Sequence, residues 1–371
     1  MGYRDLHLEP FDEGTLSKLE IFEDYTEAWI PPFVMKGVEE IHIFDVFAGP
    51  GYDLNGVPGS PIRTLQMIVK HIGIILQKKT NITLHLNEFE PNKGEQEKFE
   101  LLRKNCKKYI SDHEKLKYCL EVKFYNKDAE ELLPELLPKI KSYPSLVLLD
   151  QNGIKFISRE YISELEKLST TDFLFFVSSS YFKRLGMTDE FQKVLEFSEE
   201  ELNEIEWANI HRVVVDKLKK RLSPGSDLRL YPFSIKKGRN IYGIIFGATH
   251  PLAVDKFLNI SWKKNKKNGE ANFDIDEDQS KYQGELFGKR KLTKIEKFKD
   301  ELEQKVLEGD IRNNKEALMF TYDSGNSRKT ANKFLRKLKR QGKIDYKGRT
   351  PGVTYDNVFK KCKTVTYKVR S

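Results

Sequence analysis

The sequence has few cysteines and no long apolar run. Its three cysteines, Cys106, Cys119 and Cys362, form no CxxC pair, which argues against a disulfide framework and a cysteine-based metal site. We therefore expect a reducing, cytoplasmic environment and no metal. The N-terminus has no apolar stretch behind a basic start, and no segment reaches the roughly 18 apolar residues that span a bilayer. Secretion and membrane contact are not expected.

The composition is that of a folded protein with a modest basic excess. A chain of 371 residues is too long for one typical core and fits two domains. Hydrophobic residues make up 39% and aromatics 12%, enough to bury real cores. Lys and Arg outnumber Asp and Glu by 64 to 56, which only becomes a sign of polyanion binding if the excess is concentrated in one region.

Strands and helices alternate over residues 1–262, which predicts an α/β fold with a mostly parallel, Rossmann-like sheet. A helical stripe over 15–29 is expected to stop at Pro31 and Pro32, and a second helix to begin with Ser60 as its N-cap. Later helices are expected at 93–109 and 129–140. Strands are expected at 40–47, 82–87, 120–125, 145–150, 173–177 and 241–248, with the last at the far side of the sheet.

Residues 263–292 are charged and poor in apolar side chains, which predicts a linker. Residues 293–371 then read as three helices followed by two short β segments. That order predicts a small winged helix-turn-helix domain.

The first predicted strand ends in a glycine-rich turn that is typical of a ligand site. The run Asp45-Val46-Phe47-Ala48-Gly49-Pro50-Gly51 lets the backbone approach a ligand closely, and Asp45 can pair with the ammonium of an amino-acid-like cofactor. This favours S-adenosylmethionine over a dinucleotide, with Asp45, Phe47, Ala48, Gly49 and Gly51 as contacts. An ordinary strand-to-loop turn is the alternative.

Two further acidic residues follow strands. Glu88 comes after the second strand, where a carboxylate can accept from both ribose hydroxyls. Asp128 follows the third strand and can accept from an adenine amino group, or can equally be a helix N-cap.

The fourth strand ends in Asp150-Gln151-Asn152-Gly153, at the edge where open α/β sheets hold ligands. Asp150 and Asn152 are the candidate catalytic residues, because their side chains can hold an exocyclic amine in line with a methyl donor. A turn without a ligand is the alternative. Ser178-Ser179-Ser180-Tyr181 lines the same cleft or is a plain polar turn.

The helix predicted over 327–340 carries basic residues and no acidic one. Its apolar stripe runs through Ala331, Phe334, Leu335 and Leu338. A solvated face would normally mix signs, so this face favours phosphate contacts, with a protein or acidic surface as the alternative. The candidate nucleic-acid contacts are Arg328, Lys329, Lys333, Arg336, Lys337 and Arg340.

Taken together, these motifs resemble those of the three-Cys-motif partner proteins. The likeness spans roughly residues 10–260 and is carried by the helix 19–29, Phe47 to Gly51, Gly59-Ser60-Pro61, Glu88 and the turn 149–153. The resemblance implies a methyltransferase-like Rossmann fold and a partner with three clustered cysteines, an iron-sulfur, radical-type protein. Many relatives have Asp-Pro-Phe-Gly where this chain has Asp150 to Gly153, so the prolines that stiffen that turn are missing.

Two hypotheses of function follow. The first is an S-adenosylmethionine-dependent methyltransferase-like protein that acts on DNA or RNA, on a base amine. The second, motivated by the altered Asp150 turn, is a non-catalytic nucleic-acid-binding adaptor for a three-Cys-motif partner, in a mobile-element or phage-defence cassette.

Overall fold

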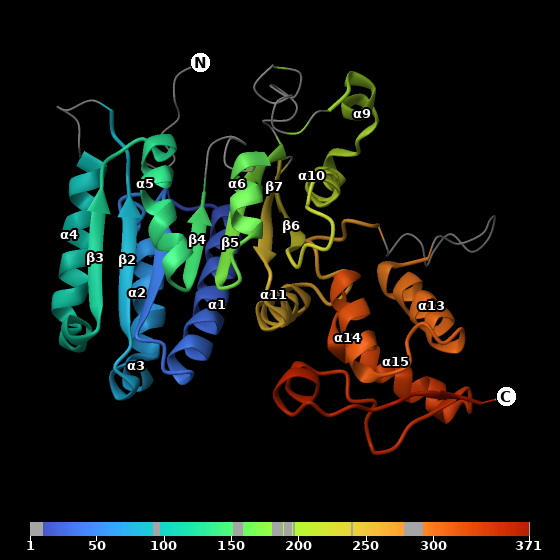
Figure 1. Ribbon diagram of the computed structural model, residues 1–371. Coiled ribbons are helices and arrows are strands. Elements are labelled where there is room, and N and C mark those ends of the chain that lie inside the picture. The colour runs from blue at the N-terminus through green and yellow to red at the C-terminus, as the bar shows by residue number, and fades with distance from the viewer. Residues whose placement is uncertain are drawn as a thin grey trace. The chain divides into compact units, whose positions relative to one another are not determined.

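The structure is a computed structural model that describes residues 10–91, 97–150, 159–179, 197–238, 240–277 and 292–370, with the single positions 188 and 195. The chain forms two compact units, Met1–His250 and Pro251–Ser371 (Figure 1).

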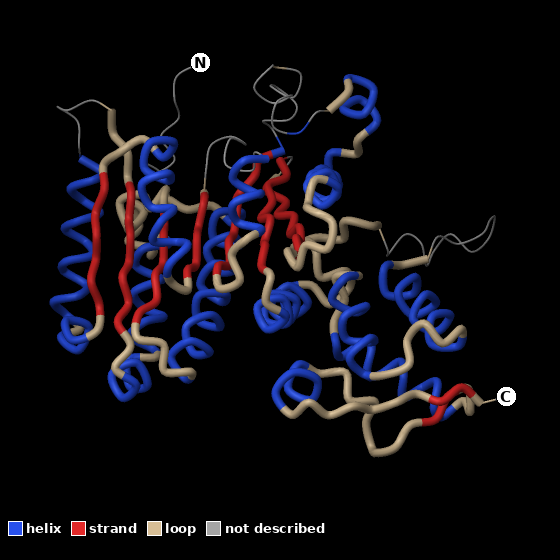
Figure 2. Tube along the Cα trace, viewed as in Figure 1, coloured by secondary structure: helices blue, strands red, loops and turns tan. Residues whose placement is uncertain are grey.

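Seven strands form one sheet in the first unit. They are β1 (Glu40–Asp45), β2 (Asn81–Asn87), β3 (Leu120–Tyr125), β4 (Ser145–Leu149), β5 (Thr171–Ser178), β6 (Arg229–Lys237) and β7 (Asn240–Ala248). Their order is β3-β2-β1-β4-β5-β7-β6, with β1 to β5 parallel and β7 antiparallel to both of its neighbours (Figure 2). An antiparallel β7 between β5 and β6 distinguishes this order from the 3-2-1-4-5-6 order of dinucleotide-binding Rossmann folds. The predicted α/β, Rossmann-like class is confirmed, in its methyltransferase-like form.

Helices cover both faces of this sheet. On one face lie α1 (Glu13–Met35), α2 (Ser60–Lys70), α3 (Ile72–Lys78) and α4 (Glu97–Asp112), which pack against one another. On the other face lie α5 (Ala129–Ser142), α6 (Arg159–Glu166) and α10 (Ile210–Lys220), whose apolar side chains form a core with the strands. Short helical segments occupy Glu114–Tyr118, Glu199–Glu204 (α9) and Trp207–Asn209.

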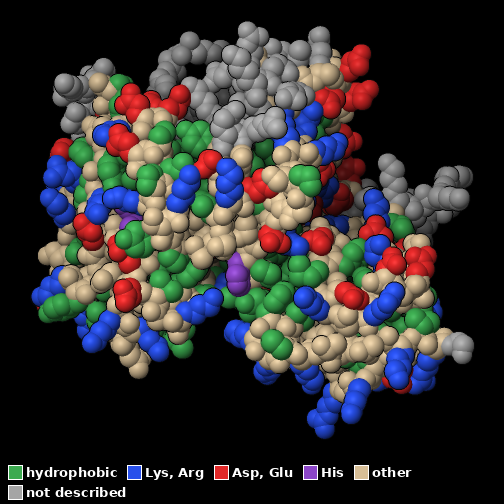
Figure 3. Space-filling model, in the orientation of Figure 1, with side chains coloured by type: hydrophobic (Ala, Val, Ile, Leu, Met, Phe, Trp, Pro, Cys, Tyr) green, Lys and Arg blue, Asp and Glu red, His purple; other side chains and the backbone are tan. Residues whose placement is uncertain are grey.

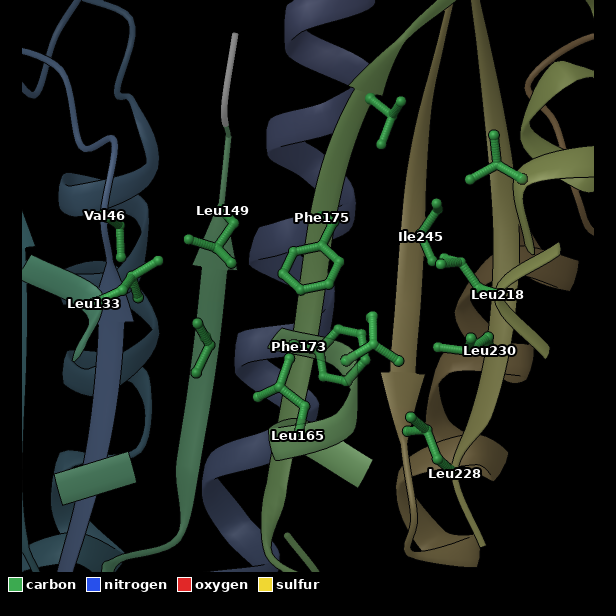
Figure 4. Packing of buried hydrophobic residues seen from close by; sticks show 14 of the residues in the cluster. Val46, Leu133, Leu149, Leu165, Phe173, Phe175, Leu218, Leu228, Leu230 and Ile245 are labelled. Carbon is green, nitrogen blue, oxygen red and sulfur yellow. The ribbon is translucent and has the colours of Figure 1, made fainter. Parts of the chain in front are cut away.

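Alternation along the strands decides which side chains reach which layer. Figure 4 shows Val46, Leu149, Phe175 and Ile245 across the strands, in the cluster packed under α5 and α10. Because successive strand residues point to opposite faces, Asp45 points to the face covered by α1 and α2.

The prediction that the first helix stops at the proline pair is wrong: α1 continues through Pro31 and Pro32 to Met35. A proline inside a helix leaves the carbonyl four residues earlier without its N–H partner. For Pro31 that carbonyl belongs to Glu27, and it lies 3.1 Å from Nε2 of His71. A side chain from the neighbouring segment therefore replaces the missing backbone donor.

Helix α2 begins at Ser60, but its N-cap is Gly59, so the prediction that Ser60 caps the helix is wrong. The Ser60 side chain hydrogen-bonds the Asp45 carboxylate instead. Pro61 stands in the first turn of the helix, where its missing N–H costs nothing.

The strand predicted over 241–248 is β7, and it lies between β5 and β6 rather than at the far side of the sheet. The outer position belongs to β6, which the sequence did not predict as a strand. Pro232 lies within β6, and a proline is tolerated on an edge strand because no ladder partner needs its N–H.

The second unit contains α11 (Pro251–Lys264), α13 (Lys294–Leu307), α14 (Asn314–Asp323) and α15 (Arg328–Arg340), followed by β8 (Ile344–Asp345) and β9 (Lys368–Val369). The two short strands pair antiparallel, and a single helical turn, Asp356–Lys360, lies between them. The predicted order of three helices and two β segments is thus present in α13 to β9.

Helix α11 packs with the second unit, whereas the sequence placed the boundary after Trp262. The indole Nε1 of Trp262 donates to Gly325 O at 3.0 Å, and the Tyr322 hydroxyl donates to Asp255 at 3.0 Å. Part of the segment expected as a linker is also packed, because Nζ of Lys294 donates to Asn268 O at 2.9 Å. Residues 278–291 lie outside the described part of the chain.

In the described residues, none of the helices combines the length and the apolar character needed to span a bilayer.

Candidate functional site

Asp45 ends β1 in a fully buried position. Its side chain is 1% exposed, and Oδ2 has no hydrogen-bond partner among the described residues. Burial raises the pKa of Asp45 to about 7, and the nearby Asp150 charge adds to the rise, while hydrogen bonds from Ser60 and the Phe47 N–H and the charge of Lys18 oppose it. A buried carboxylate oxygen without a donor is a place for a ligand cation or N–H group.

The glycine turn after β1 needs glycine at two positions. Gly49 and Gly51 have φ of 66° and 97°, the left-handed region that other residues avoid. The turn is held by Gly59 N–H donating to Gly51 O at 2.8 Å and by Asn105 Nδ2 donating to Pro50 O at 2.8 Å.

Two other predicted contacts, Phe47 and Ala48, belong to the same turn. Phe47 is half-buried, and the Ala48 N–H donates to Asn87 O at 2.9 Å. The structure therefore places the predicted cofactor contacts of the turn after β1 next to the end of β2.

Glu88 lies directly against this turn. Its Oε2 accepts from the Gly49 N–H at 2.8 Å, and Oε1 has no donor among the described residues. Burial raises the pKa of Glu88 to about 7, with smaller contributions from the charges of Glu90 and Asp45, against lowering by the Gly49 N–H and Lys98. One carboxylate oxygen is thus fixed to the backbone and the other is available to a hydroxyl donor.

Asp150 follows β4, next to Asp45 across the sheet, since Asp45 pairs with Leu148 in register. Its Oδ2 forms an ion pair with Nζ of Lys18 from α1. Nζ of Lys18 also lies 4.4 Å from the centroid of the Phe176 ring. Lys18 was not predicted, because a single lysine in a helical stripe looks like an exposed residue and its partner lies far along the chain.

Asp128 is the N-cap of α5, and its Oδ1 accepts from Glu130 N at 2.8 Å. This is the helix-cap role that the sequence left open, and contact with an adenine stays a prediction.

Asn152 and the rest of the turn after Asp150 lie outside the described residues, so its predicted role stays a prediction. In the serine loop after β5, Ser178 and Ser179 are buried, and Ser180 and Tyr181 lie outside the described part.

Helix α15 forms the basic face predicted for the second unit. Ser327 caps it by accepting from Lys329 N at 3.2 Å, and its apolar stripe is buried as predicted. Within the part of the chain that the structure describes, five of the six candidate contacts are exposed and pair with no carboxylate: Lys329, Lys333, Arg336, Lys337 and Arg340. Figure 3 shows Lys and Arg side chains projecting from the lower end of this unit.

Arg328 differs from the other five. It is partly buried, and its Nε lies 3.3 Å from Oδ1 of Asp255 in α11. Removing Arg328 would leave that buried carboxylate uncompensated, so this residue has a structural partner as well as its predicted contact.

The described residues contain no grouping of three or more His, Cys, Asp or Glu side chains arranged for a metal ion.

No protein-family model matches the sequence, and no curated protein sequence matches it. Among solved structures there is a likeness to the complex of Trm1 from Pyrococcus horikoshii with S-adenosyl-L-methionine, at 11% sequence identity and a TM-score of 0.33. The match covers 67% of this chain and 59% of the Trm1 chain, so it spans less than two thirds of that structure. A TM-score this low is no evidence for a shared site.

Proposed function

We propose that this protein binds S-adenosylmethionine at the carboxyl ends of β1, β2 and β4 and methylates a nucleic-acid base amine. The observation that carries the proposal is the meeting of Asp45, the Gly49 turn and Glu88 at one edge of a methyltransferase-like sheet, with Oδ2 of Asp45 buried and without a donor among the described residues.

The residues present fit this cofactor. Asp45 is suited to accept from its ammonium group, and Glu88 to accept from the ribose hydroxyls while Gly49 holds it in place. When bound, the cofactor would supply a methyl group from its sulfonium centre. The demethylated cofactor would be a neutral thioether, and the acceptor nitrogen would lose one proton.

Asp150 is the residue of the described chain that we assign to the substrate amine. It lies at the end of β4 beside Asp45, and its side chain is 28% exposed, so one side remains open to a substrate. By accepting a hydrogen bond it would orient the nitrogen, and catalysis would come mainly from positioning. Asn152 is proposed for the same task.

The second unit is proposed to be a winged-helix domain that brings nucleic acid to this site. Its support is the exposed one-signed face of α15, extended by the exposed Lys347 and Arg349 in the segment between β8 and β9. Such a face neutralises phosphates and makes binding depend on salt.

The direct test is transfer of tritium from methyl-labelled cofactor into total DNA and total RNA. Asp150→Ala is expected to lose at least about 100-fold in transfer while still binding the cofactor. Exposed Asp112→Ala is the matched control and is expected to behave as wild type. Labelled cofactor that binds but never transfers would favour the adaptor function instead.

The resemblance to three-Cys-motif partner proteins adds one expectation, a partner with three clustered cysteines. It stays a prediction of the resemblance, to be checked by co-purification from the native host.

A further inference from the structure

Lys18 is a buried cation that uses one of its hydrogen-bond donors among the described residues. The residue is 8% exposed, and an ammonium carries three N–H donors. Among the described residues Nζ of Lys18 has one acceptor, Oδ2 of Asp150, and lies over the Phe176 ring. A buried charge is costly unless its hydrogen bonds are satisfied, so Lys18 calls for a further acceptor.

Asp45 has the complementary need. Within the described part of the chain its Oδ2 is buried without a donor, and the charges of both Asp150 and Lys18 act on the carboxylate. Among the described residues, one neighbourhood therefore holds an ammonium with N–H donors left over beyond its bond to Asp150 and a carboxylate whose Oδ2 lacks a donor.

An α-amino acid carries both missing partners on one carbon, an α-carboxylate and an α-ammonium. A nucleoside without an amino-acid group would satisfy neither. The charges agree as well: ionised Asp45 and Asp150 outnumber Lys18 by one, and S-adenosylmethionine carries two positive groups and one negative group.

We propose that Lys18 is a cofactor-binding residue that holds the α-carboxylate of S-adenosylmethionine, while Asp45 holds the α-ammonium. The proposal rests on the proposed function and adds to it a subsite for the amino-acid end of the cofactor. Lys18 keeps its contact with Asp150, so one ammonium joins the cofactor subsite to the residue assigned to the substrate.

The test compares two ligands that differ only in this carboxylate, S-adenosylmethionine and decarboxylated S-adenosylmethionine, by calorimetric titration. Wild type is expected to bind the carboxylate form about 10- to 100-fold more tightly, the range for a charge-assisted hydrogen bond. In Lys18→Met the ratio should fall to about one or below, because the change removes the carboxylate's partner. Methylthioadenosine, which has no amino-acid group, should bind both proteins equally.

Lys70→Met is the control. Like Lys18, Lys70 forms an ion pair with a carboxylate, that of Glu27 in α1 at 2.7 Å, but this pair lies on an exposed surface. It should keep the wild-type ratio. Lys18→Arg retains the charge and should retain the preference, which separates a lost carboxylate contact from a misfolded helix.

The outcomes separate the two claims. A preference for the carboxylate that survives in Lys18→Met overturns the role of Lys18, and so does a wild type that binds both ligands equally; in either case binding itself still supports the proposed function. Wild type that binds none of the three adenosyl ligands contradicts the proposed function and this inference together.

Discussion

At the scale of single residues, the site is dominated by two acids, buried Asp45 and half-buried Glu88. Burial raises the pKa of both to about 7; the charge of Asp150 adds to the rise at Asp45, and the charge of Asp45 adds to the rise at Glu88. Carboxylates held this way destabilise the fold when they ionise, which is expected of groups kept for a ligand rather than for stability.

This gives stability a definite pH dependence. Because the pKa of Asp45 is about 7 in the folded protein and near 3.8 when unfolded, the folded state binds more protons between these values, and the free energy of unfolding falls as pH rises from about 4 to about 7. Asp45→Asn should therefore be as stable as wild type at pH 4 and more stable at pH 8, by on the order of 2–4 kcal/mol.

Urea unfolding at the two pH values measures this difference. Exposed Asp112→Asn should match wild type at both. An Asp45→Asn protein that is less stable than wild type at pH 8 would show that Asp45 supports the fold instead.

The sequence predicted Asp45, Gly49, Glu88 and Asp150 because each lies at or shortly after the end of a strand that hydrophobic runs make visible. It did not reveal Lys18, whose partner Asp150 is 132 positions away. Only the packing of α1 on the sheet brings these two together. Asp128 was ambiguous because an N-cap and an adenine contact need the same side chain at the same place.

At the scale of elements, β7 depends on two glycines that let neighbouring rings approach the sheet. A Cβ on Gly247 would lie 2.0 Å from the Phe173 ring, and one on Gly243 would lie 2.2 Å from the His211 ring. The sequence shows glycines in a strand but not the rings that require them.

Gly247→Ala should consequently destabilise the first unit. The ring of Phe173 is fully buried and cannot move without displacing the core, so overpacking should cost about 1–3 kcal/mol. Gly73→Ala in α3 is the control, because nothing lies within 4 Å of its added Cβ, and it should be neutral or slightly stabilising. Equal melting temperatures for the two variants would contradict this account of β7.

The basic face of α15 makes a second prediction for an element. The double variant Arg336→Glu with Arg340→Glu should weaken binding to a duplex DNA and to a single-stranded RNA of about 20 nucleotides by at least about 100-fold. The slope of log affinity against log salt concentration should fall by the equivalent of about two phosphate contacts. Charge reversal at exposed Lys297 and Lys315, on α13 and α14, is the matched control. Unchanged affinity and an unchanged salt slope in the α15 variant would mean that this face binds something other than nucleic acid.

Elements were predicted best where periodicity is uninterrupted, as in β3, whose predicted and observed bounds agree. The proline rule failed in α1, which continues through Pro31 and Pro32. Whether a proline ends a helix depends on whether another group donates to the carbonyl that the proline leaves without its N–H partner. In α1 that donor is the His71 side chain, which only the tertiary structure brings near.

At the scale of the whole molecule, the chain divides after His250, so α11 belongs to the second unit. Trp262 and Asp255 join α11 to the α14–α15 region through hydrogen bonds and the Arg328 ion pair. Sequence composition marks residue 263 because charge becomes dense there, but composition does not report which core a helix joins.

A fragment that begins at Pro251 should therefore fold, while one that begins at Thr293 should be less stable by about 3 kcal/mol or more, since it loses the buried Trp262 side chain and the hydrogen bonds that Trp262 and Asp255 make with the rest of the unit. Thermal unfolding followed by circular dichroism compares the two fragments. Equal melting temperatures would place α11 outside the second unit's core.

The central claim is that S-adenosylmethionine binds where Glu88 meets the glycine turn. It is tested most directly by calorimetric titration of wild type, Glu88→Ala and the exposed control Glu121→Ala with S-adenosylmethionine and S-adenosylhomocysteine. We predict micromolar binding by wild type and Glu121→Ala and at least about a 30-fold loss in Glu88→Ala, from the loss of charge-assisted hydrogen bonding to the ribose. Folded wild-type protein that takes up neither ligand, or a Glu88→Ala protein that binds both as wild type does, would contradict it.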